Sequence, residues 1–166
     1  MYILLAGAGP AALEKMNDNP VCVFLCTKEN LLSLNALAAA VEHTSGHENT
    51  ALYFEKSYAH FAARIERVLA ERGFCVAAFS FFTSRFDEAA QTVARLRGQF
   101  QNGLYIIAGG PHATALPQAV IDAGFDVACI GEGEETFPEL IAAIARNPSA
   151  PDFASVRGVM YRAGGK

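Results

Sequence analysis

Five short apolar runs alternate with longer amphipathic segments along this chain, and few folds accommodate that order. The runs are apolar at nearly every position, as expected of strands that are buried on both faces of a parallel sheet. Each run is followed by a helical pattern, which predicts right-handed crossovers between parallel strands. The five runs are residues 21–26 (VCVFLC), 52–54 (LYF), 75–82 (CVAAFSFF), 104–109 (LYIIAG) and 127–131 (VACIG).

The segments between the runs have helical periodicity. Apolar residues recur three or four positions apart over residues 58–69, with Ser57 placed to cap the start of the helix and Gly73 to end it. Residues 136–139 (TFPE) have the spacing of a capping box, with a proline in the first turn. These patterns predict the bounds of two of the helices that cover the sheet.

The order of elements predicts an α/β fold of the flavodoxin-like (Rossmann-like) type. We expect a three-layer sandwich with a five-stranded parallel sheet in the order 2-1-3-4-5. Residues 156–161 are expected to add an edge strand or to pair with a neighbouring molecule. Neither an internal repeat nor a low-complexity segment is present in the sequence.

The composition excludes several classes of protein. The chain is 52% hydrophobic and 18% charged, with a formal charge of −4, which argues against disorder and against a nucleic-acid-binding surface. No apolar run reaches the roughly 18–20 residues that span a membrane, and the N-terminus lacks the basic region of a signal peptide. Most of the four cysteines lie in apolar runs, which favours reduced thiols and a cytoplasmic location.

Ligands of open parallel sheets bind beyond the carboxyl ends of the strands, so the loops at those ends carry the functional signal. The loop 109–117 (GGPHATALP) starts with two glycines, which let the backbone approach a ligand closely, and Thr114 is placed to cap the short helix that follows. The loop 131–137 (GEGEETF) places three glutamates at a helix start, so an anionic group is expected nearer Gly109 and Gly110. The alternative, that both loops are only tight turns, stays open.

These loops also resemble a known family. The run at 109–117, followed by D-x-x-x-x-GEGE-x-TFPEL at 126–140, resembles the cobalamin-binding domain that precedes the catalytic barrel in cobalamin-dependent radical S-adenosylmethionine enzymes. Residues 28–42 resemble the first helix of that domain, and residues 80–97 resemble its third-strand exit and the next helix. The resemblance extends over residues 20–162.

The resemblance implies a division of the chain into three parts. Residues 1–19 would be an N-terminal extension or extra strand, residues 20–146 the cobalamin-binding-like α/β domain, and residues 147–166 a linker and strand leading to a missing catalytic barrel. That barrel, in the same full-length protein, would be the partner that holds S-adenosylmethionine and a 4Fe-4S cluster. The chain alone is then a fragment that is not expected to be catalytic, and a homodimer is allowed.

The resemblance also implies a site for cobalamin at the strand ends. The corrin would face the barrel, while the dimethylbenzimidazole tail would extend down among the strand ends. The amide side chains of the corrin need backbone groups and hydroxyls as hydrogen-bond partners, and the flat base of the tail needs apolar contacts. These loops offer both. No catalytic residue and no metal ligand is expected in this chain. The residues implied to bind the cofactor are Ser80, Thr83, Gly109, Gly110, Pro111, His112, Gly131, Glu132 and Gly133.

Two departures from related patterns bear on the chemistry. Other cobalamin domains have Asp-x-His-x-x-Gly after the first strand, and its histidine ligates cobalt, but residues 26–32 (CTKENLL) contain no histidine. A bound cobalamin is therefore expected to lack a protein imidazole. The radical signature Cys-x-x-x-Cys-x-x-Cys is also absent, because Cys22 and Cys26 have the first spacing but position 29 is Glu.

Two other functions compete with cobalamin binding. Residues 7–12 (GAGPAA) fit the G-x-G-x-x-[G/A] fingerprint of a dinucleotide-binding domain, with Glu29 placed 20 residues beyond Gly9, but the helix that should follow is broken by residues 17–20 (NDNP). The other alternative is an α/β interaction module that has kept the fold without a cofactor.

Overall fold

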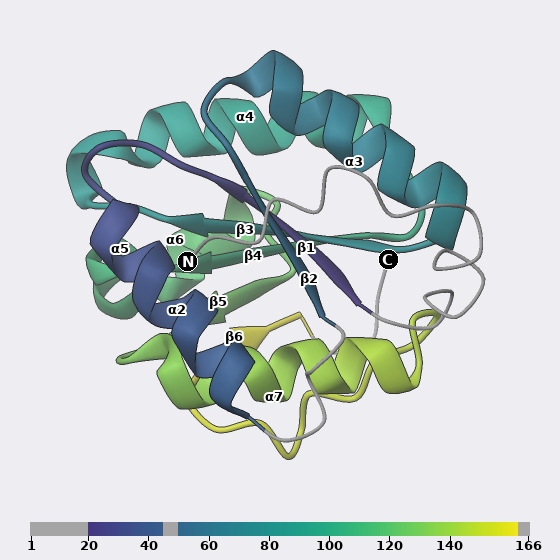
Figure 1. Ribbon diagram of the computed structural model, residues 1–166. Helices are drawn as coiled ribbons and strands as arrows, with labels where there is room; N and C mark the ends of the chain where they lie inside the picture. The colour runs from purple at the N-terminus through teal and green to yellow at the C-terminus, as the bar shows by residue number, and fades with distance from the viewer. Residues whose placement is uncertain (1–19, 45–49, 163–166) are drawn as a thin grey trace.

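The computed structural model describes residues 20–44 and 50–162 as a three-layer sandwich (Figure 1). Helices α3 (Tyr58–Arg72) and α4 (Phe86–Gln99) cover one face of the central sheet, and α2 (Leu31–His43) and α7 (Gly133–Arg146) cover the other. A 3-10 turn at Thr83–Arg85 precedes α4, and the short helices α5 (Pro111–Ala115) and α6 (Pro117–Asp122) pack with α3 and α4. The predicted fold class is confirmed.

The sheet has six strands in the order β2-β1-β3-β4-β5-β6. The first five are parallel, as predicted, in the order 2-1-3-4-5. The sixth pairs antiparallel with β5 on the same chain, so the expected terminal strand is present but covers only the last part of residues 156–161. The strands are β1 Val21–Leu25, β2 Ala51–Glu55, β3 Cys75–Ser80, β4 Leu104–Gly109, β5 Val127–Cys129 and β6 Val159–Tyr161.

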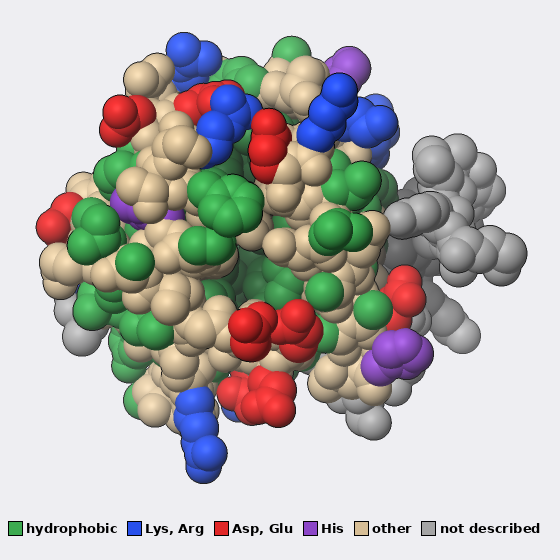
Figure 2. Space-filling model, turned by 90° about the vertical axis from the view of Figure 1, so that its left-hand side faces the viewer, with side chains coloured by type: hydrophobic (Ala, Val, Ile, Leu, Met, Phe, Trp, Pro, Cys, Tyr) green, Lys and Arg blue, Asp and Glu red, His purple; other side chains and the backbone are tan. Residues whose placement is uncertain are grey.

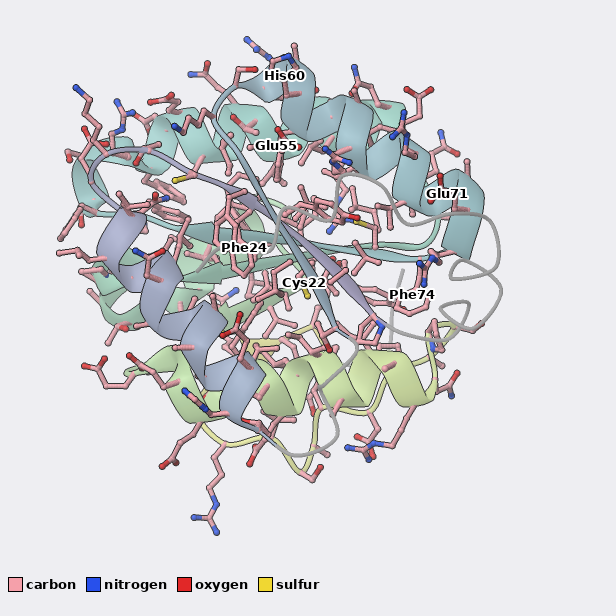
Figure 3. The ribbon with its side chains drawn as sticks, in the orientation of Figure 1. Cys22, Phe24, Glu55, His60, Glu71 and Phe74 are labelled. Carbon is pink, nitrogen blue, oxygen red and sulfur yellow. The ribbon has the colours of Figure 1, made fainter. Side chains whose placement is uncertain are left out.

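The central strands send alternate side chains into two separate cores. On β1, Val21 and Val23 pack beneath α3 and α4, whereas Cys22 and Phe24 face α2 and α7 (Figure 3). All six residues of β3 are buried. Period-two alternation with both faces covered explains why these strands are apolar at every position. None of the helices in the described ranges combines the length and apolar character that crossing a membrane requires.

The predicted helix ends are confirmed in one helix and corrected in another. Ser57 Oγ accepts a hydrogen bond from the His60 amide at 3.3 Å, and Gly73 ends α3 with a φ of +76°. Helix α7, however, starts at Gly133, so residues 136–139 lie inside it and do not form a capping box. The Thr136 hydroxyl instead donates to the carbonyl of Arg157 at 3.2 Å, and the earlier start places two glutamates in the first turn, where the helix dipole stabilises them.

A polar clasp closes the amino ends of β4 and β5. The Arg97 guanidinium on α4 donates to Asp126 Oδ2 at 2.6 Å and to the carbonyls of Leu104 and Gly124 at 3.0–3.1 Å. Asp126 Oδ2 also accepts from the Ile106 amide at 2.7 Å. These hydrogen bonds join α4, β4 and the loop before β5. They lie at the edge of the sheet opposite the loops 109–117 and 131–137.

Candidate functional site

The carboxyl ends of the five parallel strands meet at one edge of the sheet, where a cleft opens between α2 and α7. Figure 2 looks onto this edge and shows a hollow with apolar side chains inside it and carboxylates beside it. The cleft has a volume of about 110 Å³ and extends over the ends of β3, β4 and β5. Its lining comprises Phe24, Ser33, Leu34, Leu37, Ala78, Phe79, Ser80, Ile107, Gly109, Gly110, Cys129, Gly131, Glu132, Gly133, Glu134 and Phe137.

Apolar side chains form the inner part of the cleft. The ring of Phe24 on β1 lies 5.5 Å from that of Phe137 on α7 and stacks on Phe54 of β2 at 5.1 Å. Leu34 and Ile107 are both essentially inaccessible to solvent. These side chains form a closed apolar floor to the cleft, and a flat apolar group lying against it would be removed from water without competing hydrogen bonds.

Glycine backbone forms the outer part of the cleft. Gly110 has a φ of +90°, and a Cβ atom at this position would lie 3.0 Å from Ser80 Oγ and 3.1 Å from the backbone N and O of Phe81. At Gly133 a Cβ would meet Leu37 Cδ2 at 2.8 Å, which shows how closely α7 approaches α2. A ligand in the cleft would therefore contact peptide groups directly at these two loops.

The structure brings six of the nine residues implied as cofactor contacts to the cleft wall. The other three lie outside it, and contact with a cofactor stays a prediction for all nine. Thr83 and Pro111 are exposed, whereas the His112 ring is buried beside Phe86, with ring centroids 4.2 Å apart. The six residues in the cleft wall are Ser80, Gly109, Gly110, Gly131, Glu132 and Gly133.

Three polar side chains tie neighbouring strand exits together. The Asn30 amide bridges the exits of β1 and β3, and His112 Nδ1 lies 3.1 Å from Thr83 Oγ1, which links the exits of β4 and β3. Thr114 was expected to cap a helix, but it lies inside α5, and its hydroxyl accepts from the Gly131 amide at 3.0 Å. These bonds hold the four loops around the cleft in one arrangement.

The charged groups at this edge include the exposed Lys28 and Lys56, in the loops after β1 and β2, and a group of glutamates at the start of α7. Glu134 and Glu135 lie in the first turn of α7, next to Glu132. The Arg85 guanidinium is paired with Glu88 at 3.0 Å. Among the described residues there is no group of three or more His, Cys, Asp and Glu side chains that could hold a metal ion. An anionic group would meet fewer carboxylates near Gly110 than at the start of α7.

The walls of the cleft that α2 and α7 form were not identified from the sequence. Ser33 and Leu37 of α2 were not singled out, because this helix is apolar on most of its surface and no stripe marks the face that borders the cleft. Phe137 was identified only as a core residue. The available signal was topological: β1 and β5 are followed by helices on the same face of the sheet, so α2 and α7 had to lie side by side.

The four cysteines provide a test of the packing around the cleft. All four are buried and free; burial raises the pKa of the Cys22 and Cys75 thiols and raises that of Cys129, in the cleft wall, to about 12. Because the thiolate is the reactive form, we expect Ellman's reagent at pH 8 to label the native chain only slowly. Four thiols should react at once in urea. A thiol that reacts rapidly in the native chain would contradict this packing.

Comparison with known proteins identifies the family. The sequence model of the B12 binding domain matches residues 28–141, which include α2, the cleft loops and the first half of α7. The chain is also 30% identical over 79 residues to an uncharacterized methyltransferase of Pyrococcus horikoshii. That alignment covers 46% of this chain and 17% of the methyltransferase. The chain belongs to the B12 binding domain family.

Proposed function

We propose that this chain holds cobalamin at the carboxyl edge of its sheet and presents it to a radical S-adenosylmethionine domain. The observation that carries the proposal is the cleft between α2 and α7, which lies at the strand ends within the matched region and combines an apolar interior with glycine loops. Residues 20–146 form the cofactor-binding part. When bound, cobalamin supplies an organometallic centre, and this chain supplies its binding site and orientation.

The cleft residues fit the chemistry of the nucleotide tail. Phe24, Leu34 and Phe137 form a closed apolar floor, and Leu37 is a partly exposed apolar side chain in the wall, so a flat base that enters the cleft would be removed from water. The Ser80 hydroxyl and the peptide groups beside Gly110 offer hydrogen bonds to the ribose and phosphate. A Cβ at Gly110 would approach Ser80 and Phe81 closely, so this loop has no room for a side chain between the two strand exits.

We further propose that cobalt receives no imidazole from this chain. Residues 26–32, after β1, contain no histidine, and Asn30 holds this loop against β3. Of the described histidines, His60 lies exposed on α3 (Figure 3), His43 is exposed at the end of α2, and His112 is buried beneath the β3 exit. None of these three histidines lies in the cleft wall, which supports a cobalt without a histidine ligand from the described residues.

The proposed partner is a catalytic barrel that carries the 4Fe-4S cluster and S-adenosylmethionine. The family resemblance of the loop sequences supports it, as does the name of the archaeal relative, a methyltransferase. All large hydrophobic side chains that are exposed among the described residues lie at the carboxyl edge of the sheet: Leu31, Leu32, Phe82 and Leu116. A partner over the corrin would remove this apolar surface from water.

The test is retention of hydroxocobalamin. Purified chain is incubated with an excess of hydroxocobalamin and passed through gel filtration, and the visible spectrum of the protein peak is recorded. We expect about one cobalamin per chain, with a dissociation constant that can be measured by titration. A parallel incubation with NAD⁺ tests the dinucleotide alternative, whose fingerprint at residues 7–12 lies outside the described residues. Retention of NAD⁺ alone, or of neither compound, would overturn the proposal.

A further inference from the structure

Asn30 is one of the few buried polar side chains in the described part of the chain, with 6% of its surface exposed. It precedes α2, and its backbone carbonyl accepts the first helical bond from the Leu34 amide at 2.9 Å. An asparagine in this position usually turns its side chain toward its own helix to cap it. Here the side chain makes no capping bond and points to the sheet instead.

The side chain of Asn30 makes three hydrogen bonds at the strand ends. Its Oδ1 accepts from the Thr27 amide at 2.8 Å, which closes the turn after β1. Its Nδ2 donates to the carbonyl of Leu25 on β1 at 3.0 Å and to the carbonyl of Ser80 on β3 at 3.1 Å. Every polar atom of the amide group is therefore used.

These bonds lie where the sheet itself no longer joins the two strands. The paired register of β1 and β3 ends at Phe24 and Ala78. Beyond that pair the two strands lead in different directions. Strand β1 continues to α2 on one face of the sheet, and β3 continues to α4 on the other. This is the switch point of the sheet, the place where open α/β sheets bind ligands. The Asn30 amide forms hydrogen bonds to both strands just beyond the point where their backbone pairing ends.

The same bridge joins two elements that form walls of the cleft. Ser80 belongs to one wall, and its Oγ lies 3.0 Å from the Cβ position at Gly110. Helix α2, which starts directly after Asn30, brings Ser33 and Leu37 to the other wall. Without the amide, the hydrogen bond between Asn30 and the end of β3 would be lost, and the apolar packing of Leu34 in the core that includes Ala78 would remain.

We infer that Asn30 is a positioning residue for the cofactor: it fixes the start of α2 against the end of β3 and so keeps the cleft at the width that cobalamin requires. This inference rests on the proposed function. Asn30 contributes through Ser80 and α2, not by contact with the cofactor. Its removal should therefore weaken cobalamin binding by more than the accompanying loss of stability explains.

A purely structural role would give a different result, and the Arg97 clasp supplies the matched control. Arg97 also bridges separate elements through hydrogen bonds to backbone carbonyls, but it does so at the amino end of β4. Arg97→Ala should lower the midpoint of thermal unfolding by an amount comparable to that caused by Asn30→Ala. Only Asn30→Ala should also change the cleft.

The experiment compares wild type, Asn30→Ala, Asn30→Asp and Arg97→Ala in the full chain at 10 °C, with folding checked by far-UV circular dichroism. Asn30→Asp keeps the shape and the acceptor for the Thr27 amide but turns a carboxylate oxygen toward the two carbonyls. Hydroxocobalamin is titrated into each variant and binding is read from the visible spectrum. We expect at least a tenfold rise in the dissociation constant for both Asn30 variants and less than a twofold change for Arg97→Ala.

Two results would overturn the inference while leaving the proposed function intact: wild-type affinity in either folded Asn30 variant, or an equal loss of affinity in Arg97→Ala. Should Asn30→Ala fail to fold, Asn30→Asp decides on its own, because it preserves the side-chain volume. Failure of the wild-type chain to bind hydroxocobalamin would overturn the proposed function, and the positioning role with it.

Discussion

Replacing Ser33 with tryptophan should abolish cobalamin retention without unfolding the chain. Ser33 is exposed on α2 and borders the cleft, so an indole at this position would occupy space in a cavity of only about 110 Å³. Serine and tryptophan have similar helix propensities, and exposed substitutions usually change the free energy of unfolding by less than about 0.5 kcal/mol. We expect the dissociation constant for hydroxocobalamin to rise at least about a hundredfold, equivalent to ~2.7 kcal/mol.

The control for this prediction is Ala39→Trp on the same helix. Ala39 is also exposed but does not border the cleft, so the same side chain is added to the same helix away from the proposed site. Visible titration and urea unfolding are measured for both variants. Wild-type affinity in Ser33→Trp would show that the cofactor does not use this cleft, and an equal loss in Ala39→Trp would point to a general effect on α2.

The strands could be predicted because burial on both faces leaves a direct mark on the sequence. Residues such as Val23 and Phe24 face opposite cores, so neither position tolerates a polar side chain and the run is continuous. Strand β6 was harder to place, because Val159–Tyr161 is short, only partly buried and antiparallel. Its pairing depends on β5, a partner about 30 positions away, and its residues show no periodicity of their own.

The details of the cleft could not be predicted, because they depend on contacts between distant residues. The Thr136 hydroxyl meets the carbonyl of Arg157, and Thr114 meets the amide of Gly131, although local spacing suggested that both threonines cap helices. The bond from Asn30 to Ser80 joins residues 50 positions apart. Local patterns therefore located the loops correctly, whereas the functions of individual polar side chains within them required the three-dimensional arrangement.

Replacing Gly110 with alanine should destabilise the chain far more than the same change at the neighbouring Gly109. Gly110 combines a φ of +90° with a ψ of −176°, a backbone region that is essentially restricted to glycine. Holding another residue there costs about 1–3 kcal/mol. The new Cβ would also lie 3.1 Å from the backbone N and O of Phe81, atoms that cannot move without disturbing the exit of β3.

At Gly109, by contrast, a Cβ would make only ordinary contacts, 3.9 Å from Cys129 Cβ and from the carbonyl oxygen of Phe79, and φ is not positive. Gly109→Ala should therefore stay within about 1 kcal/mol of wild type, while Gly110→Ala should lose at least about 2 kcal/mol and retain less cobalamin, because strain and close contacts add at the same loop. Urea unfolding of the two variants measures the difference. Equal stabilities would mean that the loop after β4 can relax, and that the close approach of Gly110 to Ser80 and Phe81 is not required by the fold.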